Sequence, residues 1–582
     1  MKNNAQIVSQ QTKTVMPKRV VLDLPPYGRP EEGRRDFVRL DFCENTEGYP
    51  DSYPDGMPPD WTSAYPEYAD FKRRLTAFYG VSENTLLLTN GSDDGISVIC
   101  NTYIEPGEDT AIISTPCFSM FPHCLLLAGA KLRAVKVLPN LDFNLEGIDQ
   151  ALKEGAKLAI FATPENPTGA QIPQYKVEEW CSQYPETLIV IDEAYAEFAQ
   201  TTFVNLVSTY SNLVVTKTFS KAWGMAGLRL GCVFAQPQLI DYFGRVALPY
   251  GVNASAVWTA NKLLDRPDAV QAYVGAVSAR KALLVKELEK RQFKVRDGAG
   301  NSVLLSMGIN AEKFCEFARN KNVLVRNRSA SVFPLGDSDP MWGRVRVSIG
   351  TESEQSAFLD ALDSFCASYG VIFDLDGTLV DTSESFDQTV ALMVEKHSGK
   401  PLVEKELQKL REEGGYNDDW VSIVELLRRR GVPTSVQEIG PEALALYLTL
   451  AMQTETLLWT FQALKKLGER YPIFIVTGRS RFEYSKVWGD RLDPVFKRVY
   501  CADDVPGCAL KPAPDYILRN MVDFNLAQGI YIGNSVDDMM AGRDAGVERI
   551  GITTSASEAA LKEAGGQMII QEMSQLEKVF QL

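Results

Sequence analysis

Two aspartates stand two residues apart in Val371-Ile-Phe-Asp-Leu-Asp-Gly-Thr, where an apolar run meets a glycine. Side chains alternate along an extended strand, but a glycine turn at its end lets Asp374 and Asp376 converge on one cation and one phosphoryl group. One carboxylate can then attack phosphorus while the other transfers a proton. The segment therefore predicts phosphoryl-transfer chemistry with these two aspartates as catalytic groups.

Two later segments offer partners for this chemistry. Ile473-Phe-Ile-Val-Thr-Gly-Arg can present the hydroxyl of Thr477 to a phosphoryl oxygen. Leu510-Lys-Pro can present the ammonium of Lys511, which would neutralise charge beside a phosphorylated aspartate. We therefore expect both residues to assist catalysis.

Oxygen ligands for a metal follow in Gly533-Asn-Ser-Val-Asp-Asp, where Asp537 adds a further carboxylate. Carboxylate and amide oxygens suit hard, octahedral Mg²⁺. The expected metal ligands are Asp374, Asp376, Asn534 and Asp538.

A second chemistry is indicated by Leu213-Val-Val-Thr-Lys-Thr-Phe-Ser-Lys, a strand pattern that ends at Ser220 and Lys221, with Arg229 eight residues further on. A lysine at a strand end can form an imine with an aldehyde cofactor, and a nearby arginine can bind the phosphate of that cofactor. A surface lysine and arginine would be the simpler interpretation if the pair stood alone.

Upstream residues supply what such a cofactor needs. In Leu188-Ile-Val-Ile-Asp-Glu-Ala-Tyr, Asp192 leaves an apolar strand close to Tyr195, and a buried carboxylate can keep a pyridine nitrogen protonated. Asn166, in Thr163-Pro-Glu-Asn-Pro, can donate to a phenolate oxygen. Ser92 and Asp93 begin a helix whose free amides can hold a phosphate, although these side chains can also simply cap that helix.

Two series of strands must position these groups. Short apolar runs alternate with helical patterns at 86–89, 110–114, 158–162, 188–191, 213–216 and 232–235. A second series begins at Gly370 and continues at 473–477, 499–502, 530–533 and 549–552. This alternation predicts an α/β fold in which helices wrap two largely parallel sheets.

The boundary between the two series falls near 367–370 with almost no linker, which predicts two domains in fixed or nearly fixed contact. Residues 1–30 are polar and then proline-rich and predict an N-terminal arm, so we expect the domains at 31–367 and 370–582. A long helical insertion, about 383–470, separates the first two strands of the second domain.

Composition limits the partners. The net charge of −15 repels polyanions, so we expect neither nucleic acid nor a membrane as a partner, and no apolar stretch of about 18 residues predicts a membrane span. Ten cysteines without a CxxC pair, and a polar start without a signal core, predict the reducing cytoplasm. Only two histidines are present, which excludes multi-histidine metal sites.

The order of Asn166, Asp192, Tyr195, Lys221 and Arg229, together with Ser220-Lys-Ala-Trp-Gly-Met-Ala-Gly-Leu-Arg-Leu-Gly, resembles the fold-type-I aminotransferases that depend on pyridoxal 5′-phosphate. The resemblance covers about residues 35–365 and is strongest to the histidinol-phosphate aminotransferase branch. It implies a large mixed-sheet domain with a small domain, and an imine between Lys221 and the cofactor. It also implies that Asp192 pairs with the pyridine nitrogen, and that Asn166 and Tyr195 contact the ring oxygen.

The same resemblance implies further contacts. Phe118 would stack on the cofactor ring, and the residues around its phosphate would be Ser92, Thr218, Ser220 and Arg229. Arg346, with Arg326 as a second candidate, would hold the anionic end of the substrate. Tyr65 would reach the active site of a neighbouring subunit, which suggests a homodimer. The family's Asn-Glu-Asn-Pro-Tyr-Gly is replaced here by Cys43-Glu-Asn-Thr-Glu-Gly-Tyr, so this segment does not imply imidazole specificity.

Residues 370–582 resemble the haloacid-dehalogenase-type phosphatases, with the insertion as a helical cap. The resemblance implies that Asp374 is the nucleophile and Asp376 the general acid and base. Asn534 stands where the family usually has an aspartate, which should weaken metal affinity unless Asp537 compensates. Within the cap, we hypothesise that Gly415, Tyr416 and Asn417 border the substrate, although this segment can also be an ordinary connection between helices.

The two resemblances together suggest a bifunctional enzyme. In histidine biosynthesis, transamination of imidazole-acetol phosphate, with glutamate as amino donor, directly precedes hydrolysis of histidinol phosphate. One alternative keeps both chemistries but acts on an aromatic or other phosphorylated amino and keto pair, in secondary metabolism or salvage. Another makes the C-terminal domain a non-catalytic sensor or docking module, because of Asn534. A dinucleotide-binding enzyme is a poor fit, since no Gly-x-Gly-x-x-Gly follows a strand.

Overall fold

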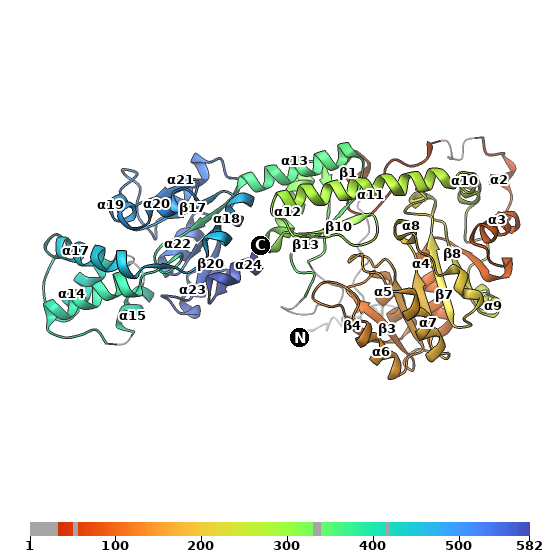
Figure 1. Cartoon of the computed structure of the whole chain (residues 1–582), viewed down its shortest axis with the longest axis horizontal. Helices are drawn as coiled ribbons and strands as arrows, with labels where there is room; N and C mark the ends of the chain where they lie inside the picture. The colour runs from red at the N-terminus through yellow and green to blue at the C-terminus, as the bar shows by residue number, and fades with distance from the viewer. Residues whose placement is uncertain (1–32, 51–55, 330–338, 404, 414–415, 417) are drawn as a thin grey trace, which may run out of the picture.

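The computed structural model describes residues 33–50, 56–329, 339–403, 405–413, 416 and 418–582. The expected N-terminal arm, 1–30, therefore lies outside the described residues. Figure 1 shows an elongated arrangement, with a helical layer at one end and a large sheet domain at the other.

A seven-stranded mixed sheet forms the centre of the large domain, in the order β2-β8-β7-β6-β5-β3-β4. Strand β8 runs antiparallel to both of its neighbours, and the remaining pairs are parallel. The central strands are buried along their whole length, as expected for a sheet covered on both faces. The strands are β2 (Leu86–Thr89), β3 (Thr110–Thr115), β4 (Lys131–Lys136), β5 (Leu158–Ala162), β6 (Leu188–Asp192), β7 (Leu213–Thr218) and β8 (Gly231–Ala235).

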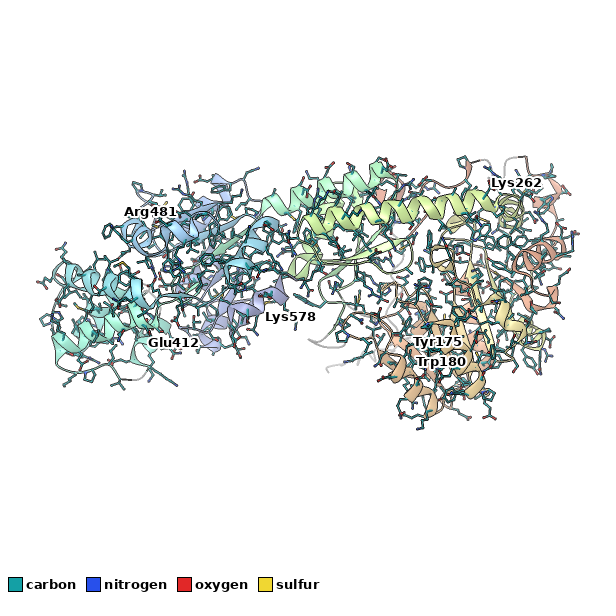
Figure 2. All side chains as sticks on the ribbon, in the orientation of Figure 1. Tyr175, Trp180, Lys262, Glu412, Arg481 and Lys578 are labelled. Atoms are coloured by element: carbon teal, nitrogen blue, oxygen red, sulfur yellow. The ribbon has the colours of Figure 1, made fainter. Side chains whose placement is uncertain are left out.

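Helices cover both faces of this sheet and enclose two separate hydrophobic clusters (Figure 1). In Figure 2 the labelled Trp180 and Tyr175 lie in this domain, and Trp180 is fully buried. The helices are α2 (Asp60–Ser63), α3 (Ala69–Tyr79), α4 (Ser92–Tyr103), α5 (Met120–Ala128), α6 (Leu145–Lys153), α7 (Gln174–Gln183), α8 (Ala196–Ala199), α9 (Pro237–Val246) and α10 (Ala254–Leu264).

The small domain follows the long helix α11 (Pro267–Lys290). Its antiparallel sheet has the order β12-β13-β10-β9, and a second pair of short strands, β1 and β11, brings the start of the described chain against it. The elements are β1 (Val38–Arg39), β9 (Val295–Arg296), β10 (Ser302–Ser306), α12 (Ala311–Asn320), β11 (Val323–Leu324), β12 (Arg326–Asn327), β13 (Arg344–Ser348) and α13 (Glu352–Ser368).

The C-terminal domain begins without a linker, because α13 ends at Ser368 and β14 starts at Tyr369. Its six-stranded parallel sheet has the order β18-β17-β14-β19-β20-β21. The strands are β14 (Tyr369–Phe373), β17 (Ile473–Val476), β18 (Arg498–Tyr500), β19 (Gln528–Gly533), β20 (Glu548–Ile552) and β21 (Met568–Ile570). The helices around it are α18 (Phe461–Arg470), α19 (Arg481–Tyr484), α20 (Asp490–Leu492), α21 (Asp515–Asp523), α22 (Val536–Asp544), α23 (Glu558–Glu563) and α24 (Leu576–Val579).

A helical cap is inserted between β14 and β17. It is connected to the sheet domain through an antiparallel pair, β15 (Val380–Asp381) and β16 (Thr456–Leu457). The cap contains the π-helix η8 (Ser383–Asp387), α14 (Gln388–Ser398), α15 (Glu406–Glu412), α16 (Asp419–Arg429) and α17 (Val436–Thr454). The insertion is therefore shorter than the expected range of about 383–470, because α18 contributes Leu464 and Leu467 to the core beside the sheet.

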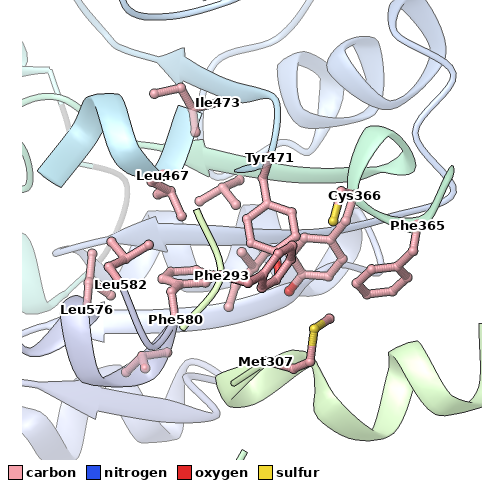
Figure 3. Packing of buried hydrophobic residues seen from close by; sticks show 14 of the residues in the cluster. Phe293, Met307, Phe365, Cys366, Leu467, Tyr471, Ile473, Leu576, Phe580 and Leu582 are labelled. Atoms are coloured by element: carbon pink, nitrogen blue, oxygen red, sulfur yellow. The ribbon is translucent and has the colours of Figure 1, made fainter. Parts of the chain in front are cut away.

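One hydrophobic cluster continues from the small domain into the C-terminal domain. Phe293, Met307 and Phe365 pack near Tyr471 and Phe580 of the following domain (Figure 3). Arg470 joins them: its Nη1 donates to the Phe580 carbonyl at 2.6 Å, its Nη2 donates to the Gln292 carbonyl, and it lies 4.3 Å from the centroid of the Phe293 ring. The two domains thus share buried apolar surface and polar contacts.

Candidate active sites

Lys221 follows β7 and lies beside residues from distant parts of the chain. Its Nζ donates to the carbonyl oxygen of Phe42 at 2.9 Å and lies 5.8 Å from the centroid of the Tyr195 ring. Loss of solvation lowers the pKa of Lys221, and the charge of Arg346 acts in the same direction. A lower pKa leaves more of the amine neutral, which is the form that attacks an aldehyde.

Asp192 ends β6 and is 2% exposed. Its Oδ1 accepts a hydrogen bond from the Thr216 hydroxyl at 2.6 Å. Burial raises the pKa of Asp192 to about 7, and the hydrogen bond from Thr216 opposes this effect. A positively charged group placed beside this carboxylate would relieve the cost of ionising it.

Three of the expected residues form a chain of hydrogen bonds. Asn166 Nδ2 donates to the Tyr195 hydroxyl at 3.3 Å, and Arg346 Nη1 donates to Asn166 Oδ1 at 2.5 Å. Arg326 faces Arg346 on the neighbouring strand, and its guanidinium lies 5.1 Å from the centroid of the Phe42 ring. The structure therefore brings the expected ring contacts and both expected substrate arginines to one place.

The expected phosphate contacts also gather around one arginine. Arg229 Nη2 donates to Asp93 at 3.0 Å, Arg229 Nη1 donates to the Ser220 hydroxyl at 3.3 Å, and Thr218 donates to Ser220 at 2.9 Å. Ser92 is buried at the first turn of α4, directly after Gly91. Helix amides, hydroxyls and a guanidinium together suit a phosphate group.

Phe118 and Tyr65 were also expected at the cofactor or the substrate, but they take no part in these hydrogen bonds. Phe118, after β3, packs edge to face against Phe121, with ring centroids 5.7 Å apart. Tyr65 is 75% exposed and stacks on Tyr250 at 4.5 Å. Its ring therefore faces outward within this chain.

Cys43 is a buried residue of this site that sequence reasoning did not assign a role. Its amide donates to the Ser348 hydroxyl at 2.9 Å, and Asn301 Nδ2 donates to its carbonyl at 3.1 Å. Burial acts to raise the pKa of the thiol, but the charges of Arg346 and Lys221 outweigh this effect and hold the pKa below its usual value. The departure of Cys43-Glu-Asn from the family segment was the available signal.

In the C-terminal domain, Asp374 follows β14 and is 3% exposed. Lys511 Nζ donates to Asp374 Oδ1 at 2.6 Å and to Asp538 Oδ1 at 2.7 Å, and the Thr378 hydroxyl donates to Asp374 Oδ2 at 3.2 Å. Burial raises the pKa of Asp374 to about 7, while Lys511 acts to lower it. One ammonium thus bridges an expected nucleophile and an expected metal ligand.

Asn534, Asp537 and Asp538 follow β19. Asp538 completes a capping box with Ser535 at the start of α22, and Asn534 Nδ2 donates to the Ser555 hydroxyl at 2.7 Å. Asp537 is 3% exposed. Within the described residues, no three acidic, histidine or cysteine side chains are arranged so that they could hold a metal ion. The donor atoms near Asp374 are nonetheless oxygen atoms with an excess of carboxylates, which suits a hard cation.

Asp376 is held by an arginine that sequence reasoning missed. Arg479 Nε and Nη2 donate to Asp376 Oδ1 at 2.8 and 2.5 Å, and the Thr477 hydroxyl donates to Oδ2 at 3.2 Å. Arg479 stands two residues after Thr477, in the same Thr-Gly-Arg segment. The segment therefore contained the signal, but only the folded chain shows which side chain the arginine reaches.

The cap and the sheet domain enclose a cavity of about 70 Å³ beside the two aspartates. Its described lining includes Asp374, Asp376 and Arg479 from the sheet domain, with Asp419 and Trp420 from the cap. Its lining does not include Tyr416, which packs against the hydrophobic core of the cap, so the expected role of Tyr416 at the substrate is not supported. Gly415 and Asn417 lie outside the described residues.

Comparison with known protein families divides the chain into the same two parts as the structure does. The sequence model of the family described as aminotransferase class I and II matches residues 62–362, just over half of the chain. The model described as haloacid dehalogenase-like hydrolase matches residues 371–552. The two matches lie on either side of the junction between α13 and β14.

Curated relatives of the first part are named histidinol-phosphate aminotransferase. The protein of Parabacteroides distasonis is 30% identical over 310 residues, which cover 52% of this chain and 87% of that protein. The protein of Bacteroides thetaiotaomicron is 29% identical over 331 residues, which cover 56% of this chain and 90% of that protein.

Solved structures show the same fold. Histidinol-phosphate aminotransferase from Sinorhizobium meliloti, in complex with pyridoxal-5′-phosphate, aligns with a TM-score of 0.53 at 22% identity, covering 60% of this chain and 97% of that chain. A Thermus thermophilus aspartate aminotransferase double mutant aligns with a TM-score of 0.50 at 18% identity, covering 60% of this chain and 99% of that chain. Among the described helices, none has the length and apolar character needed to cross a bilayer. The chain belongs to the class I and II aminotransferases, and it is an enzyme that joins this aminotransferase to a haloacid dehalogenase-like hydrolase.

Proposed function

We propose that the chain catalyses two successive steps: transfer of an amino group from glutamate to imidazole-acetol phosphate, and hydrolysis of the resulting histidinol phosphate. The observation that carries the proposal is the position of one reactive side chain in each domain. Lys221 follows the buried strand β7 and lies 5.8 Å from the centroid of the Tyr195 ring, and Asp374 follows the buried strand β14 and accepts a hydrogen bond from Lys511. The names of the relatives support the substrate of the first step.

The aminotransferase site fits pyridoxal 5′-phosphate. Asp192 is a buried carboxylate with raised pKa, which suits a cationic ring nitrogen, and the cluster around Arg229 suits a phosphate. Bound there, the cofactor would supply an aldehyde and an electron-withdrawing ring. Lys221 would move the proton at the substrate carbon, and Arg346 would bind the carboxylate of glutamate.

The hydrolase site fits a two-step mechanism. A carboxylate oxygen of Asp374 attacks phosphorus, the ester P–O bond breaks, and Asp376 gives its proton to the leaving alkoxide. Asp376 then takes a proton from water, whose oxygen attacks phosphorus, releases phosphate and restores the carboxylate of Asp374. Lys511 and the Thr477 hydroxyl stabilise the phosphoryl oxygens. Mg²⁺, held by oxygens of Asp374, Asp376, Asn534 and Asp538, would supply further positive charge.

A homodimer is supported by an exposed apolar surface on the large domain. Tyr65, Val246, Leu248 and Tyr250 are 75%, 44%, 78% and 55% exposed. Contiguous apolar groups at a protein surface mark interaction sites. All ten cysteines are free thiols, which supports a place in the reducing cytoplasm.

The test is to assay the purified chain, supplied with pyridoxal 5′-phosphate and Mg²⁺, for both half-reactions. Lys221→Ala should abolish amino transfer and leave phosphate release unchanged, and Asp374→Asn should do the reverse. An enzyme that transaminates phenylpyruvate but not imidazole-acetol phosphate would exclude the histidine assignment.

A second candidate function follows from Asn534, which replaces a carboxylate and binds Ser555. In this version the C-terminal domain is a non-catalytic sensor or docking module. Release of phosphate in Mg²⁺ by wild-type protein, lost in Asp374→Asn, would exclude it.

A further inference from the structure

We propose that Arg479 is a positioning residue that orients Asp376 for proton transfer to the leaving group, and that Glu455, in the second connection to the cap, holds Arg479 in place. This inference rests on the proposed phosphatase function and deepens it. The new element is the set of contacts made by Arg479 and Glu455. The expected roles of Asp374 as nucleophile and Asp376 as general acid and base do not require these contacts.

The geometry fixes which oxygen of Asp376 can act. Two nitrogens of Arg479 donate to Oδ1, whereas Oδ2 receives only the longer 3.2 Å bond from the Thr477 hydroxyl. A guanidinium cannot accept a hydrogen bond, so an oxygen that it engages twice is a poor place for a proton. Oδ2, which accepts only from Thr477, is therefore the oxygen better placed to carry the proton.

Arg479 is itself fixed by the cap. Its side chain is 1% exposed, and its guanidinium lies 5.1 Å from the ring centroid of Phe386 and 5.5 Å from that of Tyr447. Phe386 belongs to η8 and Tyr447 to α17, and the two rings stack at 3.9 Å. A guanidinium of the sheet domain is thus packed against aromatic side chains of the cap.

Glu455 connects this arginine to both chain segments that enter the cap. Its Oε1 accepts from Arg479 Nη2 at 2.9 Å and from the Ser385 hydroxyl at 2.7 Å, and its Oε2 accepts from Trp488 Nε1 at 2.6 Å. Ser385 follows β15, and Glu455 directly precedes β16, so each lies beside one strand of the pair that connects the cap. Glu455 is fully buried, and a buried carboxylate of this kind is stable only when it is paired.

The burial of Arg479 has a cost at its third nitrogen. Nη1 is buried and has no hydrogen-bond partner among the described residues. Arg479 also lines the cavity that contains Asp374 and Asp376. An unpaired buried N–H is costly, so the other nitrogens of Arg479 must offset this cost through their contacts with Asp376 and Glu455.

The inference predicts a specific kinetic signature. An alkoxide leaving group needs the proton of Asp376, whereas p-nitrophenolate leaves without one. Arg479→Lys keeps the charge but cannot form the two-nitrogen contact, so it should lower kcat for histidinol phosphate about tenfold more than kcat for p-nitrophenyl phosphate. KM should change less than kcat, because the altered contact acts on the transition state.

The experiment measures both esters at saturating Mg²⁺ in wild type, Arg479→Lys, Glu455→Gln and the control Arg481→Lys. Arg481 pairs with Asp504 and should change neither ester. In an Asp376→Asn background, Arg479→Lys should have no further effect on the alkyl ester, because the residue it orients is already inactive. The positioning role would be overturned if Arg479→Lys lowered kcat equally for both esters. It would also be overturned if Arg479→Lys lowered kcat for the alkyl ester as strongly in the Asp376→Asn background as in wild type.

Glu455→Gln provides an independent test of the positioning role if Arg479→Lys does not fold. Glu455→Gln should also lower kcat more for histidinol phosphate than for p-nitrophenyl phosphate, but by a smaller factor than Arg479→Lys. An unchanged ratio of the two kcat values would show that Glu455 does not hold Arg479 in place. Wild-type protein that hydrolyses neither ester contradicts the proposed phosphatase function itself, and the inference falls with it. Circular dichroism and thermal melting of each variant establish that the folded protein is compared.

Discussion

Lys511 donates through Nζ to Asp374 Oδ1 at 2.6 Å, although the two residues are separated by 137 positions in sequence. Both side chains are buried, with 5% and 4% exposure. The contact stabilises the ionised carboxylate, which is the nucleophilic form, against the effect of burial. The proposed hydrolase chemistry depends on this pair.

Lys511→Met should reduce phosphate release at least about hundredfold, because it removes the charge that stabilises both the nucleophile and the phosphoryl oxygens. Amino transfer by the same preparation should be unchanged. Lys562→Met is a matched control, since Lys562 pairs with Glu558 at the surface. Phosphate release that survives in Lys511→Met would show that the pair is structural.

Asp192 predicts a pH dependence of stability in the cofactor-free protein. Its pKa is raised from 3.8 to about 7 by burial, so between these values the folded chain holds a proton that the unfolded chain has lost. The free energy of unfolding should therefore fall as pH rises through this window, by up to about 1.4 kcal/mol per pH unit. This contribution is fully present below pH 4 and lost above pH 7.

Asp192→Asn removes that titration, so the variant should gain stability relative to wild type from pH 5 to pH 8. Urea unfolding at both pH values measures the difference. Bound cofactor should flatten the dependence, because a ring cation favours the ionised carboxylate. A constant offset between the two proteins at all pH values would contradict the assignment.

Gly91→Ala should weaken cofactor binding about tenfold or more. Gly91 has φ 83 and ψ 165, a region that is essentially restricted to glycine, and a Cβ there would lie 2.4 Å from Arg229 Nη2. Gly107→Ala is the control, because Gly107 also has positive φ but nothing within 4 Å of its Cβ position. Titration with pyridoxal 5′-phosphate, followed by absorbance, measures both variants. Equal affinities would mean that Arg229 does not bind the phosphate.

Leu248→Glu should shift the protein from dimer to monomer, because it places a charge in the exposed apolar surface of the large domain. Val522→Glu, at a residue that is 75% exposed on α21, should leave the oligomeric state unchanged. Sedimentation velocity separates the outcomes. A wild-type monomer, or a dimer that persists in Leu248→Glu, would contradict this interface.

Arg470→Met should weaken the coupling between the small and C-terminal domains. The variant leaves the carbonyls of Phe580 and Gln292 without their donor, at about 1–3 kcal/mol each. Differential scanning calorimetry should show one main transition in wild type and a separate, earlier transition of the C-terminal domain in the variant. Unchanged melting would mean that apolar packing alone joins the domains.

The sequence predicted the strands best where they are buried. The runs at 110–114, 158–162 and 188–191 agree with β3, β5 and β6 within a residue, because central strands of a covered sheet are continuously apolar. The strand β4 was missed, since Lys131–Lys136 is an edge strand in which three charged side chains interrupt the apolar ones and no residue is buried. Helix α18 was assigned to the cap because helical periodicity does not tell which domain a helix packs on.

The site residues also fall into two groups: those whose positions local sequence predicts, and those whose contacts only the folded chain creates. The positions of Asp192, Lys221 and Asp374 at or just after strand ends were predictable from the apolar runs before them, whereas their catalytic roles stay predictions. Cys43 and Arg479 were not, because their contacts join segments that are far apart in the chain and that only folding brings together. Tyr416 was assigned to the substrate from glycine-rich surroundings; it is partly buried against the core of the cap, and its role at the substrate stays a prediction.

The direct continuation of α13 into β14 gives the hydrolase no flexible tether on which it could swing toward the transaminase. Figure 1 places the large sheet and the helical cap at opposite ends of the molecule. In the proposed reaction sequence, the phosphate ester formed by the transaminase would therefore have to travel between these ends to reach the hydrolase of the same chain. An added scavenging phosphatase should intercept this intermediate, while the single chain ensures that both catalysts are made in equal amounts.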